Sequence, residues 1–318
     1  MNKKEKTKNK KKQGSAGLKE LRISMKKNTT LYIFLVLPII YFAVFKYIPM
    51  FGNIIAFRKY VPGQSYFGVS WEGFRYFEMF LKDEAFWNAF KNTVILSGIS
   101  LLICFPIPII FSLLLNELMQ KKFKKLVQSV TIVPRFLSVV VVVAMMNALL
   151  SPSTGIVNRI IEHFGGEAIY FMNDPFWFRI IYICSELWQF VGWNSIIYMA
   201  VLSSADQEQY EAAMVDGAGK IKQAIHITLP IMIPTIAINL IISLGNILNV
   251  GFEKVLLMYT PTTYETADVI QTFAYRIGLM GANYSYGTAV GLFQGVISLT
   301  LLWIANRITN KRWECGLW

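Results

Sequence analysis

Residues 94–115, VILSGISLLICFPIPIIFSLLL, decide the fold class of this chain. The stretch carries no charged side chain, and about 20 apolar residues are enough for a helix to cross a hydrocarbon layer of about 30 Å. A strand of a membrane barrel needs only about ten residues, and lipid offers no water to unpaired backbone groups. The stretch therefore predicts a membrane-spanning helix.

Five further apolar runs of similar length occur at residues 31–48, 127–150, 180–202, 231–250 and 289–308. With 54% hydrophobic and 16% charged residues, the 318-residue chain is more apolar than a single soluble core requires. We therefore expect an all-α polytopic membrane protein with six transmembrane helices, contained within residues 29–308.

The basic residues are distributed unevenly around these runs. Residues 1–27 hold eleven Lys or Arg against Glu5 and Glu20, a composition typical of a flexible tail. If the N-terminus lies inside, 20 of the 31 Lys and Arg fall at Arg307 or in the cytoplasmic segments 1–28, 116–126, 203–230 and 309–318. This positive-inside bias predicts a multi-pass protein of the plasma membrane with both termini cytoplasmic. It also explains the net charge of +12 without nucleic acid.

The first long segment outside the membrane, near residues 49–91, is rich in aromatic side chains. Its stretch 71–90 mixes aromatics with charges, which is typical of an interfacial helix. An aromatic belt at the ends of the spans would have the same composition, so the sequence leaves both readings open.

Cofactor chemistry finds no support in the sequence. Cys104, Cys184 and Cys315 have no metal-ligand spacing, and His163 and His226 are the only histidines. The chain has no GxxxxGK[ST] phosphate loop. We expect no metal, no cofactor and no catalytic residue in this chain.

Residues 203–230 form a less apolar segment between the fourth and fifth runs, and their pattern predicts a helix, a glycine turn and a second helix. Asp206 is placed to cap the first helix. Gly217 and Gly219 supply the backbone freedom of a tight turn. Pro230 is expected at the entrance to the fifth span.

The same segment carries the pattern EAA, three residues, Gly, nine residues, Ile, one residue, Leu-Pro. In this pattern the chain resembles the permeases of binding-protein-dependent ATP-driven importers, and the fold implied is that of a type I importer permease. The residues that this resemblance assigns to ATPase coupling are Glu211, Ala212, Ala213, Asp216, Gly217, Ile227, Leu229 and Pro230.

In that family the loop forms a short coupling helix that sits in a groove of the ATPase subunit. Ala212 and Ala213 would allow close approach of the partner, and Glu211 would offer a carboxylate to a basic group. The resemblance implies a second permease subunit, two ATPase subunits that hold ATP and Mg, and an extracellular solute-binding lipoprotein. Hydrolysis would then take place outside this chain.

Several other stretches resemble the carbohydrate branch of the family, and particularly its polysaccharide permeases. They are FKYIPMFGNIIAF at 45–57, KNT at 91–93, LLLNE at 113–117 and TAVGLFQ at 288–294. The cargo implied is an oligosaccharide or a polysaccharide fragment. Arg135, within the third run, departs from what we expect at that depth.

Polar side chains inside the apolar runs are candidates for the substrate path. At spacings of three and four residues, those of the fifth run are expected to share one helical face; they are Asn239, Ser243, Asn246, Asn249 and Glu253. Other runs contribute Glu186, Gln189, Trp193 and Gln294. Amide groups suit sugar hydroxyls, but they also form hydrogen bonds between helices.

Two alternatives remain at this stage. One is an importer of the same architecture that carries a non-sugar solute. The other is a secondary transporter driven by an ion gradient, for which we would expect internal repeats or broken helices.

Overall fold

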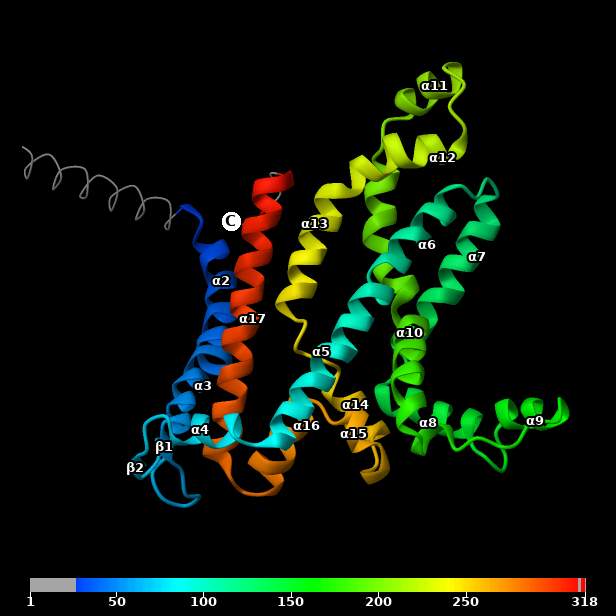
Figure 1. The fold of residues 1–318 in the computed structure, drawn as a ribbon. Coiled ribbons are helices and arrows are strands. Elements are labelled where there is room, and N and C mark those ends of the chain that lie inside the picture. The colour runs from blue at the N-terminus through cyan, green and yellow to red at the C-terminus, as the bar shows by residue number, and fades with distance from the viewer. Residues whose placement is uncertain (1–26, 314–315, 318) are drawn as a thin grey trace, which may run out of the picture.

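The computed structural model describes residues 27–313 and 316–317 of the chain. The predicted basic tail therefore lies outside the described residues, apart from its last two positions. Figure 1 shows a bundle of long helices with α11 and α12 at one end and α8, α9, α14 and α15 at the other.

The first half of the described chain contains, in order, α2 (Thr29–Phe42), η1 (Ala43–Tyr47), α3 (Ile48–Met50), η2 (Phe51–Ala56), β1 (Arg58–Lys59), β2 (Ser70–Trp71), α4 (Arg75–Leu81), α5 (Glu84–Cys104), α6 (Pro106–Asn116), α7 (Lys121–Ile132), η3 (Val133–Phe136) and α8 (Val139–Leu150). The strands β1 and β2 pair antiparallel. They are a small exception to the all-α prediction.

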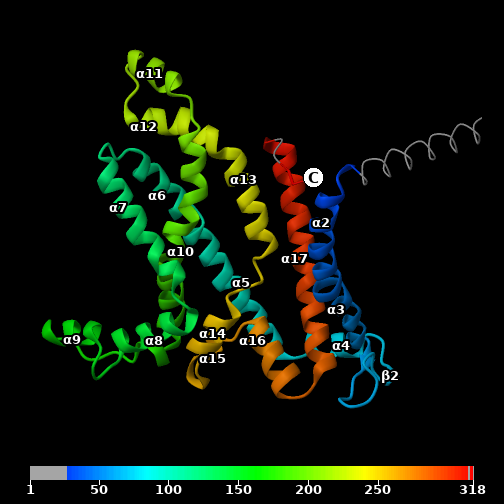
Figure 2. The ribbon, with the colours of Figure 1, turned by 180° about the vertical axis from the view of Figure 1, so that it is seen from behind.

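The second half contains α9 (Ile156–His163), η4 (Phe171–Asn173), α10 (Pro175–Ser203), α11 (Gln207–Val215), α12 (Lys220–Gln223), η5 (Ala224–Thr228), α13 (Leu229–Gly245), α14 (Phe252–Met258), η6 (Pro261–Thr263), α15 (Tyr264–Ala267), α16 (Ile270–Ala274), η7 (Tyr275–Met280) and α17 (Tyr284–Trp313). In both views α2 runs beside α17 (Figures 1 and 2).

A mostly helical membrane protein is confirmed by length and composition. Within the described residues, four helices are long and apolar enough to span a membrane, at Thr29–Ala56, Glu84–Asn116, Lys220–Gly245 and Tyr284–Lys311. Counting the bent pair Lys121–Phe136 and Val139–Leu150 as one span raises the number to five. The 29-residue α10 is long enough for a sixth but carries more polar side chains.

The predicted third span is not one straight helix. The chain bends by 101° between α7 with η3 and α8. Leu137 is extended, and the Ser138 side chain accepts a hydrogen bond from the Val141 amide, so a new helix begins there. The side chain of Gln189 on α10 donates to the Leu137 carbonyl at 3.1 Å and satisfies one backbone group at the break.

The predicted fifth span ends earlier than expected, at Gly245. A Cβ at Gly245 would lie 2.5 Å from the Leu302 side chain, so α13 and α17 approach closely where the helix ends. The Asn246 side chain donates to the Ile242 carbonyl at 3.0 Å, the same carbonyl that accepts from the Asn246 amide, and Asn246 leaves the helical conformation with φ of −101° and ψ of 8°. The chain therefore leaves the helix before Asn249 and Glu253.

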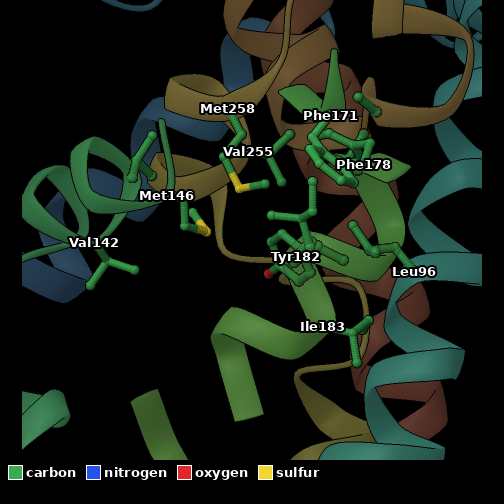
Figure 3. Close-up of a cluster of buried hydrophobic side chains, with 14 residues drawn as sticks. Leu96, Val142, Met146, Phe171, Phe178, Tyr182, Ile183, Val255 and Met258 are labelled. Atoms are coloured by element: carbon green, nitrogen blue, oxygen red, sulfur yellow. The ribbon is translucent and has the colours of Figure 1, made fainter. Parts of the chain in front are cut away.

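Helix α10 is the centre of the bundle, since it packs against α5, α6, α7 and α13. Its contact with α7 is close, because a Cβ at Gly192 would lie 2.3 Å from the Thr131 carbonyl oxygen. At the end of the bundle away from α11, α10 joins α5, α8 and α14 in a buried apolar cluster (Figure 3). This cluster includes Leu96, Val142, Met146, Phe178, Val255 and Met258.

The aromatic segment after α2 contains a short helix, α4. Its interfacial placement stays a prediction. Two of its side chains, Tyr76 and Phe80, are buried in a second cluster with Phe86 and Phe273. Part of the aromatic composition therefore serves packing within the protein.

Candidate functional site

The coupling loop, residues 203–230, has the predicted helix, turn and helix. The Asp206 side chain accepts from the Glu208 amide at 3.0 Å and caps α11. Gly217 follows with φ of +74°, a conformation that favours glycine. The second helix differs from the prediction: α12, η5 and α13 are continuous from Lys220 to Gly245, so Pro230 lies within a helix rather than at its start.

Side-chain contacts hold the loop in shape. The Tyr210 hydroxyl lies 3.1 Å from the Thr228 hydroxyl and ties α11 to η5. The buried Gln223 donates to the Ala218 carbonyl at 2.8 Å across the turn. Lys220 forms an ion pair with Glu117, at the end of α6, at 3.0 Å.

The loop leaves apolar side chains exposed at the end of the bundle. Val215 is 89% exposed and Ile221 77%, and Met214 and Ile225 are more than half exposed. We call these four residues together with Glu211 and Ala212 the coupling surface. Exposed apolar groups gathered on one surface are a common feature of protein–protein interfaces.

The other coupling residues that the sequence singled out lie around this surface. Asp216 and Gly217 are exposed in the turn, and Ala213 is half-buried. Ile227, Leu229 and Pro230 lie further along, where η5 passes into α13, and of these only Pro230 is exposed.

A polar cavity of about 250 Å³ lies between α5, α10 and the end of α13. We call it the distal cavity because it is the farther from the coupling loop. Polar side chains in its lining are Ser97, Ser100, Tyr182, Glu186, Asn194, Ser243, Asn246 and Asn249. Glu186 is the one formally charged residue in this lining, and its Oε2 accepts from the Ser100 hydroxyl at 3.1 Å.

A second cavity of about 280 Å³, the proximal cavity, adjoins the first. The two share Cys104, Phe105, Asn194 and Ser243. Trp193, Tyr198 and Asn239 line the proximal cavity only. A tract of hydroxyl and amide groups therefore runs along α10 and α13.

The predicted polar stripe of the fifth span is thus brought together only in part. Asn239 and Ser243 lie on α13, whereas Asn246 and Asn249 reach the distal cavity from the turn after it. The prediction of one continuous helical face is wrong because α13 ends at Gly245. Glu253 is exposed on α14 and lines neither cavity.

Two of the residues predicted for the substrate path do not line either cavity but form hydrogen bonds next to the cavities. Gln189 is buried against the Leu137 carbonyl. Gln294 is buried and donates to the Leu248 carbonyl at 2.9 Å and to Asn249 Oδ1 at 3.0 Å. Gln271 donates to the same Asn249 oxygen at 2.9 Å, so two amides orient one side chain of the cavity lining.

Arg135 and Glu186 are not paired in the part of the chain that the structure describes. Arg135 lies at the bend after α7, with its guanidinium carbon 5.0 Å from the Phe190 ring and 5.6 Å from the Trp193 ring. Contacts of this type stabilise a cation without an anion. Within the same residues, no group of three His, Cys, Asp or Glu could hold a metal ion.

Sequence reasoning missed Ser97, Ser100, Cys104, Asn194 and Lys254. The first three recur on α5 at spacings of three and four residues, a signal within the quoted run that could have been read as one helical face. Asn194 follows Glu186 by two turns of α10. Lys254 gave no signal, because its burial depends on packing of α14 against the bundle.

Residues 106–313 match the family described as the binding-protein-dependent transport system inner membrane component. The chain belongs to this family, and it is the permease subunit of an ABC importer rather than its ATPase. The resemblance inferred from residues 211–230 is therefore confirmed.

Similar proteins include the polygalacturonan/rhamnogalacturonan transport system permease protein YteP of Bacillus subtilis (strain 168), 40% identical over 300 residues that cover 94% of each chain. The arabinooligosaccharides transport system permease protein AraP of the same organism is 25% identical over 287 residues, or 90% of each chain.

Among solved structures, the chain is similar to part of a bacterial ABC transporter involved in the import of the acidic polysaccharide alginate. The TM-score is 0.86 with 43% identity, and the match covers 92% of this chain and 99% of that one. The same transporter has been crystallised in complex with an alginate pentasaccharide-bound periplasmic protein. The importer permease fold is thus shared along nearly the whole chain.

Proposed function

We propose that this chain forms one half of a saccharide path across the plasma membrane and that ATPase subunits bound at the coupling surface drive it. The observation that carries the proposal is the tract of amide and hydroxyl groups in the two cavities. Sugar hydroxyls need such paired donors and acceptors. The similar proteins, which are a polygalacturonan/rhamnogalacturonan permease, an arabinooligosaccharide permease and an alginate importer, support the same cargo class.

In this proposal the chain has six spans: the helix from α2 to η2, α5 with α6, the bent α7–α8 pair, α10, α13 and α17. Helix α10 has 29 residues, which at about 1.5 Å per residue exceeds the thickness of the hydrocarbon layer. The N-terminus, the coupling loop and the C-terminus lie on the cytoplasmic side, in agreement with the distribution of basic residues.

A second permease subunit would cover faces that this chain leaves open. No residue of α2 is buried, and Arg135 is exposed beside Trp193. An exposed Arg at span depth is costly in lipid, which favours a protein partner or water there. The full assembly would contain two permeases, two ATPases with ATP and Mg, and one extracellular binding protein.

The test is ATPase activity of the reconstituted assembly with its binding protein, measured across a panel of oligosaccharides. We expect one class of saccharide to stimulate hydrolysis and Glu211→Ala to reduce that stimulation roughly thirtyfold, since loss of one partner of an interfacial charge pair costs about 2 kcal/mol or more. Gln209→Ala is the matched control, because Gln209 is exposed on the opposite face of α11.

Three results would contradict the proposal. Stimulation by amino acids or peptides and by no saccharide would indicate another cargo. Uptake driven by an ion gradient without any ATPase would indicate a secondary transporter. An equal effect of Glu211→Ala and Gln209→Ala on the stimulation would show that Glu211 has no specific role in coupling.

A further inference from the structure

Lys254 is a buried cation beside the distal cavity. It belongs neither to the coupling loop nor to the polar stripe of the fifth run. It is 5% exposed. Its Nζ donates to the Tyr182 carbonyl at 3.3 Å and lies 4.6 Å from the centroid of the Tyr182 ring. A buried ammonium group is costly unless an anion balances its charge.

Glu186 is the acidic side chain one helical turn along α10 from the Tyr182 carbonyl that Lys254 contacts. Tyr182 and Glu186 are four residues apart on α10 and therefore lie on the same face of this helix. The Lys254 ammonium group is therefore held about one turn of α10 from the Glu186 side chain. One oxygen of Glu186 is engaged by Ser100, and the residue lines the distal cavity.

Lys254 itself does not line either cavity. Its ammonium group is held over the Tyr182 ring and against a backbone carbonyl, so its effect on a molecule in the cavity must act through charge. Without Lys254, the distal cavity would carry the uncompensated negative charge of Glu186. That charge would repel a saccharide that carries carboxylates and would affect a neutral saccharide much less.

We propose that Lys254 is a specificity-determining residue of the importer: by cancelling the charge of Glu186, it lets the distal cavity offer a carboxylate acceptor to sugar hydroxyls and still admit acidic saccharides. This inference rests on the saccharide path proposed above. It assigns a role to a residue on α14 that has no contact with the coupling loop.

The experiment compares trigalacturonate with its methyl ester, which lacks the carboxylate charges and carries a methyl group in place of each. Both are presented by the same binding protein to reconstituted assemblies, so the preference of the binding protein cancels when each variant is compared with wild type. The measured quantity is the ratio of ATPase stimulation by the acid to stimulation by the ester.

Lys254→Met is expected to lower this ratio roughly tenfold, the factor that follows from unit charges about 10 Å apart at an effective dielectric constant of about 20. Lys254→Arg should keep the wild-type ratio. The double variant Lys254→Met with Glu186→Gln should restore it to within about twofold, because neither charge remains.

A role of Lys254 in packing alone predicts a different pattern. Lys254→Met would then reduce stimulation by both probes equally and leave the ratio at its wild-type value; this result would overturn the inference. If the Lys254→Met assembly does not form, the single variant Glu186→Gln tests the inference instead. Glu186→Gln should raise the acid-to-ester ratio above the wild-type value, and an unchanged ratio would overturn the inference. A wild-type assembly stimulated by neither probe would overturn the proposed path with these saccharides, and the inference with it.

Discussion

The coupling loop and the two cavities are built in opposite ways. The loop is determined within one short segment, by a cap at Asp206, a left-handed turn at Gly217 and a hydrogen bond from Gln223 across that turn. The cavities are assembled from α5, α10 and α13, which are far apart in the sequence. Substitutions in the loop should therefore act locally, whereas substitutions around the cavities should act through packing between helices.

The largest effect is expected at the contact between α7 and α10. In Gly192→Ala the new Cβ would lie 2.3 Å from the Thr131 carbonyl oxygen. We therefore expect the free energy of unfolding to fall by about 3 kcal/mol. Thermal unfolding of the purified protein in detergent measures this. Gly291→Ala on α17 is the control, because nothing lies within 4 Å of its Cβ. Equal stability of the two variants would show that the close contact between α7 and α10 does not stabilise the helices that line the cavities.

An intermediate effect is expected at the support of the distal cavity. Gln294→Met should cost about 2 kcal/mol, because it leaves the Leu248 carbonyl and Asn249 Oδ1 without a shared buried donor. Saccharide stimulation of the ATPase should fall along with stability. Thr300→Val, at an exposed site on the same helix, should change neither quantity. A loss of stability without any loss of ATPase stimulation would show that Gln294 does not contribute to the saccharide path.

The smallest effect is expected in the loop. Gly217→Ala should cost about 1 kcal/mol, because the left-handed conformation disfavours a side chain while the space around it is open. Coupling of saccharide to ATP hydrolysis should weaken only a few fold. Gly219→Ala is the matched control, since Gly219 has φ of −69° and nothing within 4 Å of its Cβ. If Gly217→Ala destabilised the protein as much as Gly192→Ala, the contrast between the two regions would be wrong.

The same contrast explains what could be predicted from the sequence. The cap and the turn of the loop depend on spacing along the chain, so Asp206 and Gly217 were found correctly as local features. The coupling role of Glu211 stays a prediction. Long apolar runs likewise identified the four helices that are long and apolar enough to span a membrane and the bent α7–α8 pair, because length and composition suffice for this.

The cavities were predicted only in part, because they depend on where helices end and which helices meet. Asn249 reaches the distal cavity although α13 ends before it, and Gln189 turns to the Leu137 carbonyl at a bend that hydropathy does not register. Lys254 is buried by tertiary packing alone. No periodicity in the chain marks Lys254, and the spacing that singles out Asn249 does not reveal that α13 ends before it.

The continuous helix from Lys220 to Gly245 has a mechanical consequence. It begins in the coupling loop and carries Asn239 and Ser243, which line the cavities, near its other end. The π-helical turn η5 changes its course but does not interrupt the backbone hydrogen bonds. No loop lies between the two sites, so a displacement of α12 would reach the cavity lining along one unbroken helix.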